Sequence, residues 1–329
     1  MESRPWYDLP VEILNLIHSR LPIVEQFHFR IVCKSWHLVE AHFERNLPWV
    51  LCHFWDDSGP NCSFHIPSLN QTHIVSDHVM VNLWDAGISA SKHGWLLLQQ
   101  SNETFFFNPF SAKVIKLPNM DISFNRATFT SSPTCPDCIC FAIGSSKSCD
   151  KILISTCSPG DLKWRTTTLD GFNKVVEDVV YSNGSFYCVF SGGVLGAFFV
   201  EDYSWSMLTD TEPNNRIFSW SRLQLVESNG EILLVSRTTN FCVFKFDQSD
   251  MVWKDVNKLG NRALFLGCTS FAVEAEGKTS ALAGRIYYHE YPRFSFYSLH
   301  TEKTYTCEDF YPWVVPNAQG KIWIEPPSF

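Results

Sequence analysis

Hydrophobic residues recur at helical spacing in the first 45 residues and at strand-like spacing in almost all of the remaining chain. Near the start, Ile13, Leu14, Ile17 and Leu21 lie three or four positions apart or side by side, which places them on one face of a helix. Pro10 suits the first turn of such a helix, because the missing N–H of proline has no intrahelical partner there. The pattern predicts a short amphipathic helix that begins near residue 10.

A second apolar run follows Pro22, which interrupts the first one. Val32, Trp36, Val39 and Phe43 continue this run in steps of four, three and four residues, as the buried stripe of a helix does. Three short helices in 45 residues form a core smaller than most that fold alone. The leftover apolar surface must therefore pack on the rest of the chain or on another protein.

The body of the chain repeats a unit in which a turn glycine precedes two strands and a closing aromatic or branched residue. Gly94, Gly184, Gly230 and Gly284 open four copies, and the closing residue lies 21, 21, 23 and 21 positions further on. A fifth, divergent copy fits between residues 137 and 164. Two copies begin with Ser-Asn-Gly, and Asn-Gly between alternating apolar residues is a strong signal of a two-residue hairpin turn.

The spacing of the closing residues indicates a propeller blade. These residues are Ile115, Trp164, Trp205, Trp253 and Tyr305. They lie 49, 41, 48 and 52 residues apart, and the common propeller families use about 40 to 50 residues for a four-stranded blade. The 284 residues after position 45 then correspond to about six blades, with five or seven as alternatives and an open β-sandwich as the fallback.

We therefore predict a mainly β fold with a small α N-terminal domain. Residues 1–45 are expected to form the three-helix domain, and residues 46–329 a closed β-propeller. Up to three strands near residues 50–75 remain outside the repeats, and residues 321–324 supply one more. Because pairing of the first and last strands removes exposed sheet edges, we expect the C-terminal strand to pair with strands near residues 50–75.

Residues 9–36 resemble an F-box, with Leu-Pro and a nearby acid at the start and Val-Cys-Lys-x-Trp at the end. The resemblance implies docking onto the Skp-family adaptor of cullin-RING ubiquitin ligases, and through it contact with the cullin and RING subunits. It carries over an adaptor-binding or motif-core role to Leu9, Pro10, Ile13, Leu14, Ile17, Leu21, Phe27, Val32, Cys33 and Trp36.

Three further residues of the motif region need a separate interpretation. Cys33 is expected to be a small buried hydrophobe, since nothing near it suggests a nucleophile. No role is assigned to His28 or Phe29, which lie where members of the family vary.

The remainder resembles the C-terminal domain of unknown function, with kelch-like relatives, that follows the F-box in many plant proteins. Gly260 and Gly267 bracket a strand, and Asn108-Pro109 ends one in a turn. The resemblance rests on the order and joint presence of short motifs at residues 108–110, 115–118, 259–267, 284–288, 311–313 and 322–327.

Composition narrows the class of protein further. The chain is 45% hydrophobic and 18% charged, which is too apolar for a disordered chain. The net charge of −8 argues against nucleic acid as a partner, because phosphate binding needs a basic stripe. The sequence has no apolar run of 18 residues, and residues 1–10 contain no apolar leader, so neither membrane insertion nor secretion is indicated. We therefore expect the protein in the cytoplasm or nucleus.

Candidate enzyme and metal motifs are weak. Cys135, Cys138, Cys140 and Cys149 resemble a zinc cluster by their number, but they lack a second paired unit, and buried strand cysteines are the favoured interpretation. No phosphate loop, HExxH or GxSxG pattern occurs. No catalytic residue, metal or cofactor is therefore assigned.

Two classes of function follow from these observations. The favoured one is a non-catalytic substrate receptor of an SCF-type (Skp-cullin-F-box) ubiquitin ligase, in which the propeller holds an unidentified target protein close to the ligase. The alternative is a propeller enzyme or small-molecule-binding protein with a structural helical cap. A pocket of convergent ionisable residues at the central opening would favour the alternative.

Overall fold

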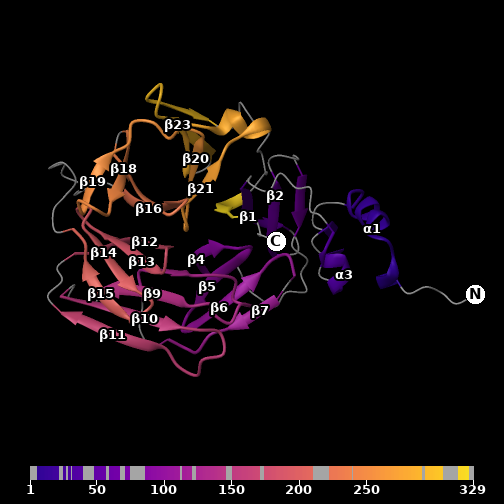
Figure 1. Ribbon diagram of the computed structural model, residues 1–329, viewed down its shortest axis with the longest axis horizontal. Helices are drawn as coiled ribbons and strands as arrows, with labels where there is room; N and C mark the ends of the chain where they lie inside the picture. The colour runs from indigo at the N-terminus through magenta and orange to yellow at the C-terminus, as the bar shows by residue number, and fades with distance from the viewer. Residues whose placement is uncertain are drawn as a thin grey trace, which may run out of the picture.

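The computed structural model shows a short helical N-terminal part and a body built almost wholly of β-sheets. Figure 1 shows the sheets arranged in a ring, with the helices outside it beside β1 and β2. The expected mainly β fold with a small helical N-terminal part is confirmed. The structure describes residues 6–21, 25–26, 29–30, 32–39, 48–56, 59–66, 71–74, 86–111, 113–120, 124–145, 150–170, 174–209, 222–238, 240–290, 293–306 and 318–325.

The helical part begins with a 3-10 turn, η1 (Trp6–Asp8), and continues with α1 (Val11–His18) and α3 (Lys34–His37). Residues 25–26 and 29–30 are also helical. The N-cap of α1 is Pro10, whose carbonyl accepts hydrogen bonds from the next helical turn at 3.0 and 3.1 Å. The predicted helix start near residue 10 is therefore confirmed.

Four sheets have four antiparallel strands each. One, in the order β25-β1-β2-β3, contains β25 (Ala318–Ile324), β1 (Trp49–Asp56), β2 (Gly59–Ile66) and β3 (Gln71–Ile74). The next contains β4 (Gly87–Lys92), β5 (Trp95–Gln100), β6 (Glu103–Asn108) and β7 (Lys113–Lys116). The third contains β8 (Arg126–Phe129), β9 (Cys140–Ser145), β10 (Lys151–Cys157) and β11 (Arg165–Asp170). The fourth contains β12 (Val176–Ser182), β13 (Ser185–Phe190), β14 (Leu195–Phe199) and β15 (Ser204–Met207).

The fifth sheet has nine strands in the order β19-β18-β17-β16-β21-β20-β22-β23-β24. Its first half contains β16 (Arg222–Ser228), β17 (Glu231–Arg237), β18 (Phe241–Asp247) and β19 (Val252–Asp255). Its second half contains β20 (Arg262–Leu266), β21 (Phe271–Glu274), the 3-10 helix η4 (Gly277–Leu282), β22 (Arg285–Glu290), β23 (Arg293–Ser298) and β24 (Lys303–Thr306). A single parallel residue pair, Glu227 with Phe271, joins the two halves.

The turn glycines lie where the repeat predicts them. Gly94, Gly184 and Gly230 have φ of 75°, 80° and 81°, and the residue before each also has positive φ, between 46° and 53°. Both central residues of a type I′ hairpin turn need positive φ, which explains the Asn-Gly pairs. Gly284 also has positive φ, at 73°, but the residue before it, Ala283, has φ −57° and ψ 145°, so the fourth copy uses a different turn.

Four of the five closing residues fall on edge strands, namely β7, β15, β19 and β24. In Figure 1, β11, β15 and β19 lie on the outside of the ring. These four closing residues are paired with a phenylalanine on the neighbouring strand: Ile115 with Phe106, Trp205 with Phe198, Trp253 with Phe246, and Tyr305 with Phe296. Trp205 and Trp253 are each the second residue of their strand, whereas Trp164 lies one position before β11. The repeat alignment therefore holds for four copies and is displaced in the divergent fifth.

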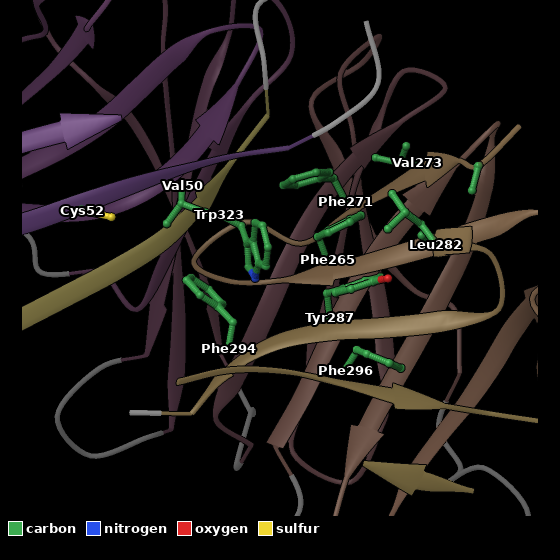
Figure 2. Packing of buried hydrophobic residues seen from close by; sticks show 12 residues of the cluster. Val50, Cys52, Phe265, Phe271, Val273, Leu282, Tyr287, Phe294, Phe296 and Trp323 are labelled. Atoms are coloured by element: carbon green, nitrogen blue, oxygen red, sulfur yellow. The ribbon is translucent and has the colours of Figure 1, made fainter. Parts of the chain in front are cut away.

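The C-terminal strand β25 pairs with β1, from Trp49 opposite Ile324 onward. Figure 2 shows Trp323 of β25 directed at the aromatic residues of the second half of the nine-stranded sheet. Its ring centroid lies 4.5 Å from that of Phe294 and 5.0 Å from that of Phe265, and the side chain is 1% exposed. Burial of such a side chain contributes about 2 kcal/mol, so this cluster holds the end of the chain against strands β20 to β23.

Candidate functional site

A small separate core organises the helical part. Leu14, Phe29 and Val39 are 2%, 5% and 1% exposed. The ring of Phe29 stacks on that of Trp36, with centroids 4.2 Å apart and an interplanar angle of 21°. Other side chains are partly buried against this core: Leu9, Ile17, Leu21 and Trp36. The core therefore uses one side of α1 and leaves the other side without cover from the described residues.

The helical part also carries several exposed large apolar side chains, which we together call the helical apolar surface. Ile13 of α1 is 43% exposed, Val32 is 62% exposed and Leu38, which follows α3, is 75% exposed. Its members are Trp6, Tyr7, Val11, Ile13, Leu16, Val32 and Leu38. Exposed apolar surface of this kind makes the helical part a candidate protein-interaction site.

The ten residues taken over from the motif divide into three groups. Pro10, Ile13 and Val32 are exposed, and Leu14 is fully buried in the small core. The half-buried residues are Leu9, Ile17, Leu21, Cys33 and Trp36. Phe27 lies outside the described residues.

Sequence reasoning missed Phe29 as a core residue, although it is the stacking partner of Trp36. It also missed Leu16 and Leu38, which lie off the apolar stripe and are among the most exposed apolar residues of this part. The sequence did contain a signal for Leu16, because a residue two positions from buried Leu14 on a helix faces away from the helical core.

Cys33 is not the buried hydrophobe that the sequence suggested, because it is half-exposed and forms the N-cap of α3. Its Sγ lies 3.1 Å from the Ser35 hydroxyl, and this hydrogen bond is the main cause that lowers the pKa of the thiol. The Ser35 hydroxyl donates to the Tyr7 carbonyl at 3.2 Å, and the Trp36 indole donates to the Trp6 carbonyl at 3.3 Å. These two bonds hold the exposed aromatic turn η1 beside α3.

A second candidate site is a cavity of about 450 Å³ in the ring of sheets. The first residues of β4, β8, β12 and β16 line it, together with residues from β20, β22 and β25. Its ionisable lining comprises Arg126, Glu177, Asp178, Arg222, Arg237 and His289. The cavity thus gathers charged groups from strands far apart in the sequence.

Asp178 is buried at the wall of this cavity, with 7% exposure. Its two carboxylate oxygens accept hydrogen bonds from the backbone N–H groups of Val179 and Leu225, each at 2.8 Å. Burial raises the pKa of Asp178 to about 6, although these two bonds and the nearby Arg126 act in the opposite direction. The carboxylate thus joins β12 to β16.

The cysteine cluster does not assemble into a metal site among the residues that can be placed. Cys138 and Cys140 are buried, Cys135 is exposed, and Cys149 lies outside the described residues. Cys140 faces Cys157 across β9 and β10, and burial raises the pKa of Cys138 to about 11. Within the described ranges, no three His, Cys, Asp or Glu residues are grouped to hold a metal ion. None of the helices in these ranges is both long and apolar enough to cross a membrane.

Comparison with known proteins assigns both parts of the chain. Residues 6–41 match the model of the F-box domain, and residues 63–308 match that of the KIB1-4 beta-propeller. The F-box protein At3g56470 of Arabidopsis thaliana is 27% identical over 97% of this chain and 88% of its own. The F-box/kelch-repeat protein At1g57790 of the same plant is 27% identical over 98% and 95%, respectively.

The alignment with the solved AfRom2 CNH domain covers 78% of this chain and 84% of that domain, with 11% identity and a TM-score of 0.43. This likeness is too weak to support an assignment of fold or function. The KIB1-4 model, in contrast, covers most of the chain, from β2 to β24. An F-box implies binding of a Skp1-like adaptor, and members of this family are typically non-catalytic adaptors. The chain belongs to the F-box proteins that carry a C-terminal KIB1-4 β-propeller.

Proposed function

We propose that this protein is the substrate-receptor subunit of an SCF-type ubiquitin ligase, acting in the cytoplasm or nucleus without catalysing a reaction itself. The observation that carries the proposal is the helical apolar surface. A small helical unit with its own core, yet with seven large apolar side chains exposed among its described residues, needs a partner to cover them. A Skp1-like adaptor is the partner that an F-box implies.

Within the motif we separate contact residues from supporting residues. Pro10, Ile13 and Val32 are accessible to an adaptor and are proposed as direct contacts. Leu14 and Trp36 support those contacts by fixing α1 and α3 on Phe29. The remaining positions taken over from the motif are proposed to flank the contact: Leu9, Ile17, Leu21, Phe27 and Cys33.

We further propose that residues 46–329 form a closed propeller of six blades, separate from the helical domain at 1–45. Two observations support this count. The halves of the nine-stranded sheet share one parallel residue pair, whereas strands within each half share up to seven. The pairing of β25 with β1 supports the closed ring, because the first and last strands then share one sheet.

The propeller is proposed to hold a target protein so that the cullin and RING subunits, recruited through the adaptor, bring ubiquitin to it. Its contribution is proximity, which converts a bimolecular encounter into a local one. No side chain of this protein takes part in bond making in that scheme.

Proximity labelling under proteasome inhibition tests the proposal. Full-length protein and the variant I13E/V32E are compared, since both substitutions lie on the exposed side of the helical core. We expect both to label the same target proteins, and only the wild type to label the adaptor, cullin and RING subunits. Equal labelling of ligase subunits by the two proteins would reject the proposal.

A further inference from the structure

Two arginines stand directly opposite one another at the cavity in the ring of sheets. Arg222 of β16 and Arg237 of β17 are Cα partners in an antiparallel pair, and both line the cavity. Directly opposite residues of an antiparallel pair project to the same face of the sheet, and like charges placed so repel one another. An anion bound between the two guanidinium groups would relieve that repulsion.

A third arginine is directed at the same space by backbone groups. Arg126 donates from Nε to the Glu177 carbonyl at 2.6 Å and from Nη1 to the Asn125 carbonyl at 2.8 Å. Carbonyl acceptors orient a guanidinium group but do not neutralise it. These two bonds therefore hold the Arg126 guanidinium at the wall of the cavity without supplying a counter-charge.

The carboxylates of the lining offset these charges only in part. Asp178 already accepts two backbone N–H bonds, and it shares the wall with Glu177. Among the described residues of the lining, three arginines thus face two acids, in a chain whose net charge is −8. An excess of positive charge in a concave site raises the local concentration of anions.

The shape of the cavity fits a small molecule with a flat or apolar part. Its volume of about 450 Å³ lies within the usual range of small-molecule sites. The Arg237 guanidinium lies over the Tyr288 ring at 4.3 Å, which leaves a planar, amphipathic wall next to the charged groups. Phe124 and Leu266 add apolar lining.

We propose that this cavity is a binding site for a small organic anion whose carboxylate or phosphate group is held by Arg222 and Arg237, with Arg126 as a third positive group. Guanidinium groups bind both kinds of anion through paired N–H donors. Strands from every sheet around the ring contribute to the lining of this cavity, and its volume of about 450 Å³ suits a free small anion better than a length of polypeptide. The site lies apart from the helical apolar surface and works independently of adaptor binding.

Phosphate titration of the full-length protein tests the site. Thermal unfolding is followed with inorganic phosphate, and separately with acetate, while chloride keeps the ionic strength constant. The test variant is R222Q, because Arg222 is exposed and its side chain makes no hydrogen bond or ion pair with the described residues. The control is R165Q. Arg165 is an exposed residue of β11 outside the cavity, and its guanidinium lies 4.5 Å from the centroid of the Tyr203 ring.

We expect phosphate, acetate or both to raise the unfolding temperature of the wild type and of R165Q. R222Q should weaken the apparent affinity by roughly tenfold, which corresponds to about 1.4 kcal/mol, while R222K should recover part of it. The absence of any anion effect at constant ionic strength, or an equal loss in R165Q and R222Q, would overturn the proposal. So would binding of an acidic peptide through Arg222 when neither free anion binds, because that outcome indicates a protein partner across the mouth.

Discussion

The carboxylate of Glu325 accepts a hydrogen bond from the backbone N–H of His93, at 3.2 Å and across 232 residues of sequence. Glu325 directly follows β25, and His93 lies in the turn between β4 and β5. Burial raises the pKa of Glu325, and the nearby Lys92 ammonium opposes that rise, as does the hydrogen bond from His93. The same burial lowers the pKa of Lys92, while Glu325 and Glu227 act in the opposite direction. The end of the chain is thus held to the second sheet as well as to β1.

Removal of this contact should destabilise the ring. E325A removes the acidic group that acts most strongly on the half-buried Lys92 and leaves the His93 N–H without its acceptor, which costs about 2 kcal/mol. Urea unfolding measures the change. E103A is the matched control, because Glu103 pairs with Lys116 at 3.2 Å on the surface and such exposed pairs contribute about 0.5 kcal/mol. Equal effects of the two variants would show that the Glu325 contact does not stabilise closure.

The buried Asp178 predicts a defined pH dependence of stability. Its pKa rises from 3.8 to about 6 on folding, chiefly through burial, so the native state binds the proton more tightly than the unfolded chain. The stabilisation that tighter proton binding at Asp178 gives the folded state is therefore fully present below about pH 4, and it is lost as the pH rises through about 6. D178N removes this titration. The advantage of the wild type over D178N should shrink by up to about 3 kcal/mol across that window.

Urea unfolding of both proteins at several pH values measures this difference. E177Q serves as the comparison, because Glu177 lies next to Asp178 and lines the same cavity. It should keep the decline of stability with pH that D178N lacks. An advantage of the wild type over D178N that grows with pH would contradict the assignment.

Phe29 should prove essential for the helical core. F29A removes the ring that stacks on Trp36 and contacts His18 at a centroid distance of 5.5 Å, and losses for such truncations are about 3 to 5 kcal/mol. In a core of three fully buried side chains among the described residues, this loss should unfold the helical part. Limited proteolysis should then cut within residues 6–39 while the sheets stay intact. V11A, at an exposed position of α1, should keep the wild-type pattern.

The repeat was predictable because each copy depends on local backbone requirements. Asn183-Gly184 and Asn229-Gly230 need positive φ at both positions, and few residue pairs other than Asn-Gly accept this readily. The second half of the nine-stranded sheet was less predictable, because β20 and β22 are parallel neighbours in the sheet although β21 and η4 lie between them in sequence. A parallel pair needs a long crossover, which no local turn signal reveals.

In the two candidate sites, too, some residues could be predicted from the local sequence pattern and others could not. Ile13 and Leu14 both belong to the apolar pattern of α1, yet one is 43% exposed and the other 2%. Which of them faces the core depends on how α1 packs against Phe29 and Val39. Arg222 and Arg237 face each other across one hairpin, but Arg126 lies on β8, about 100 residues earlier in the chain, and joins them only when the ring closes. No spacing rule in one sequence relates them.

The affinity of the full-length protein for a Skp1-like adaptor tests the central claim most directly. Isothermal titration compares the wild type with I13E and V32E, and with L162E, which places the same charge on a 97% exposed leucine of the propeller. Anchors of an interface contribute about 2 kcal/mol each, so we expect I13E and V32E each to weaken binding about thirtyfold and L162E to bind like the wild type. Unchanged adaptor affinity in I13E and V32E would contradict the account.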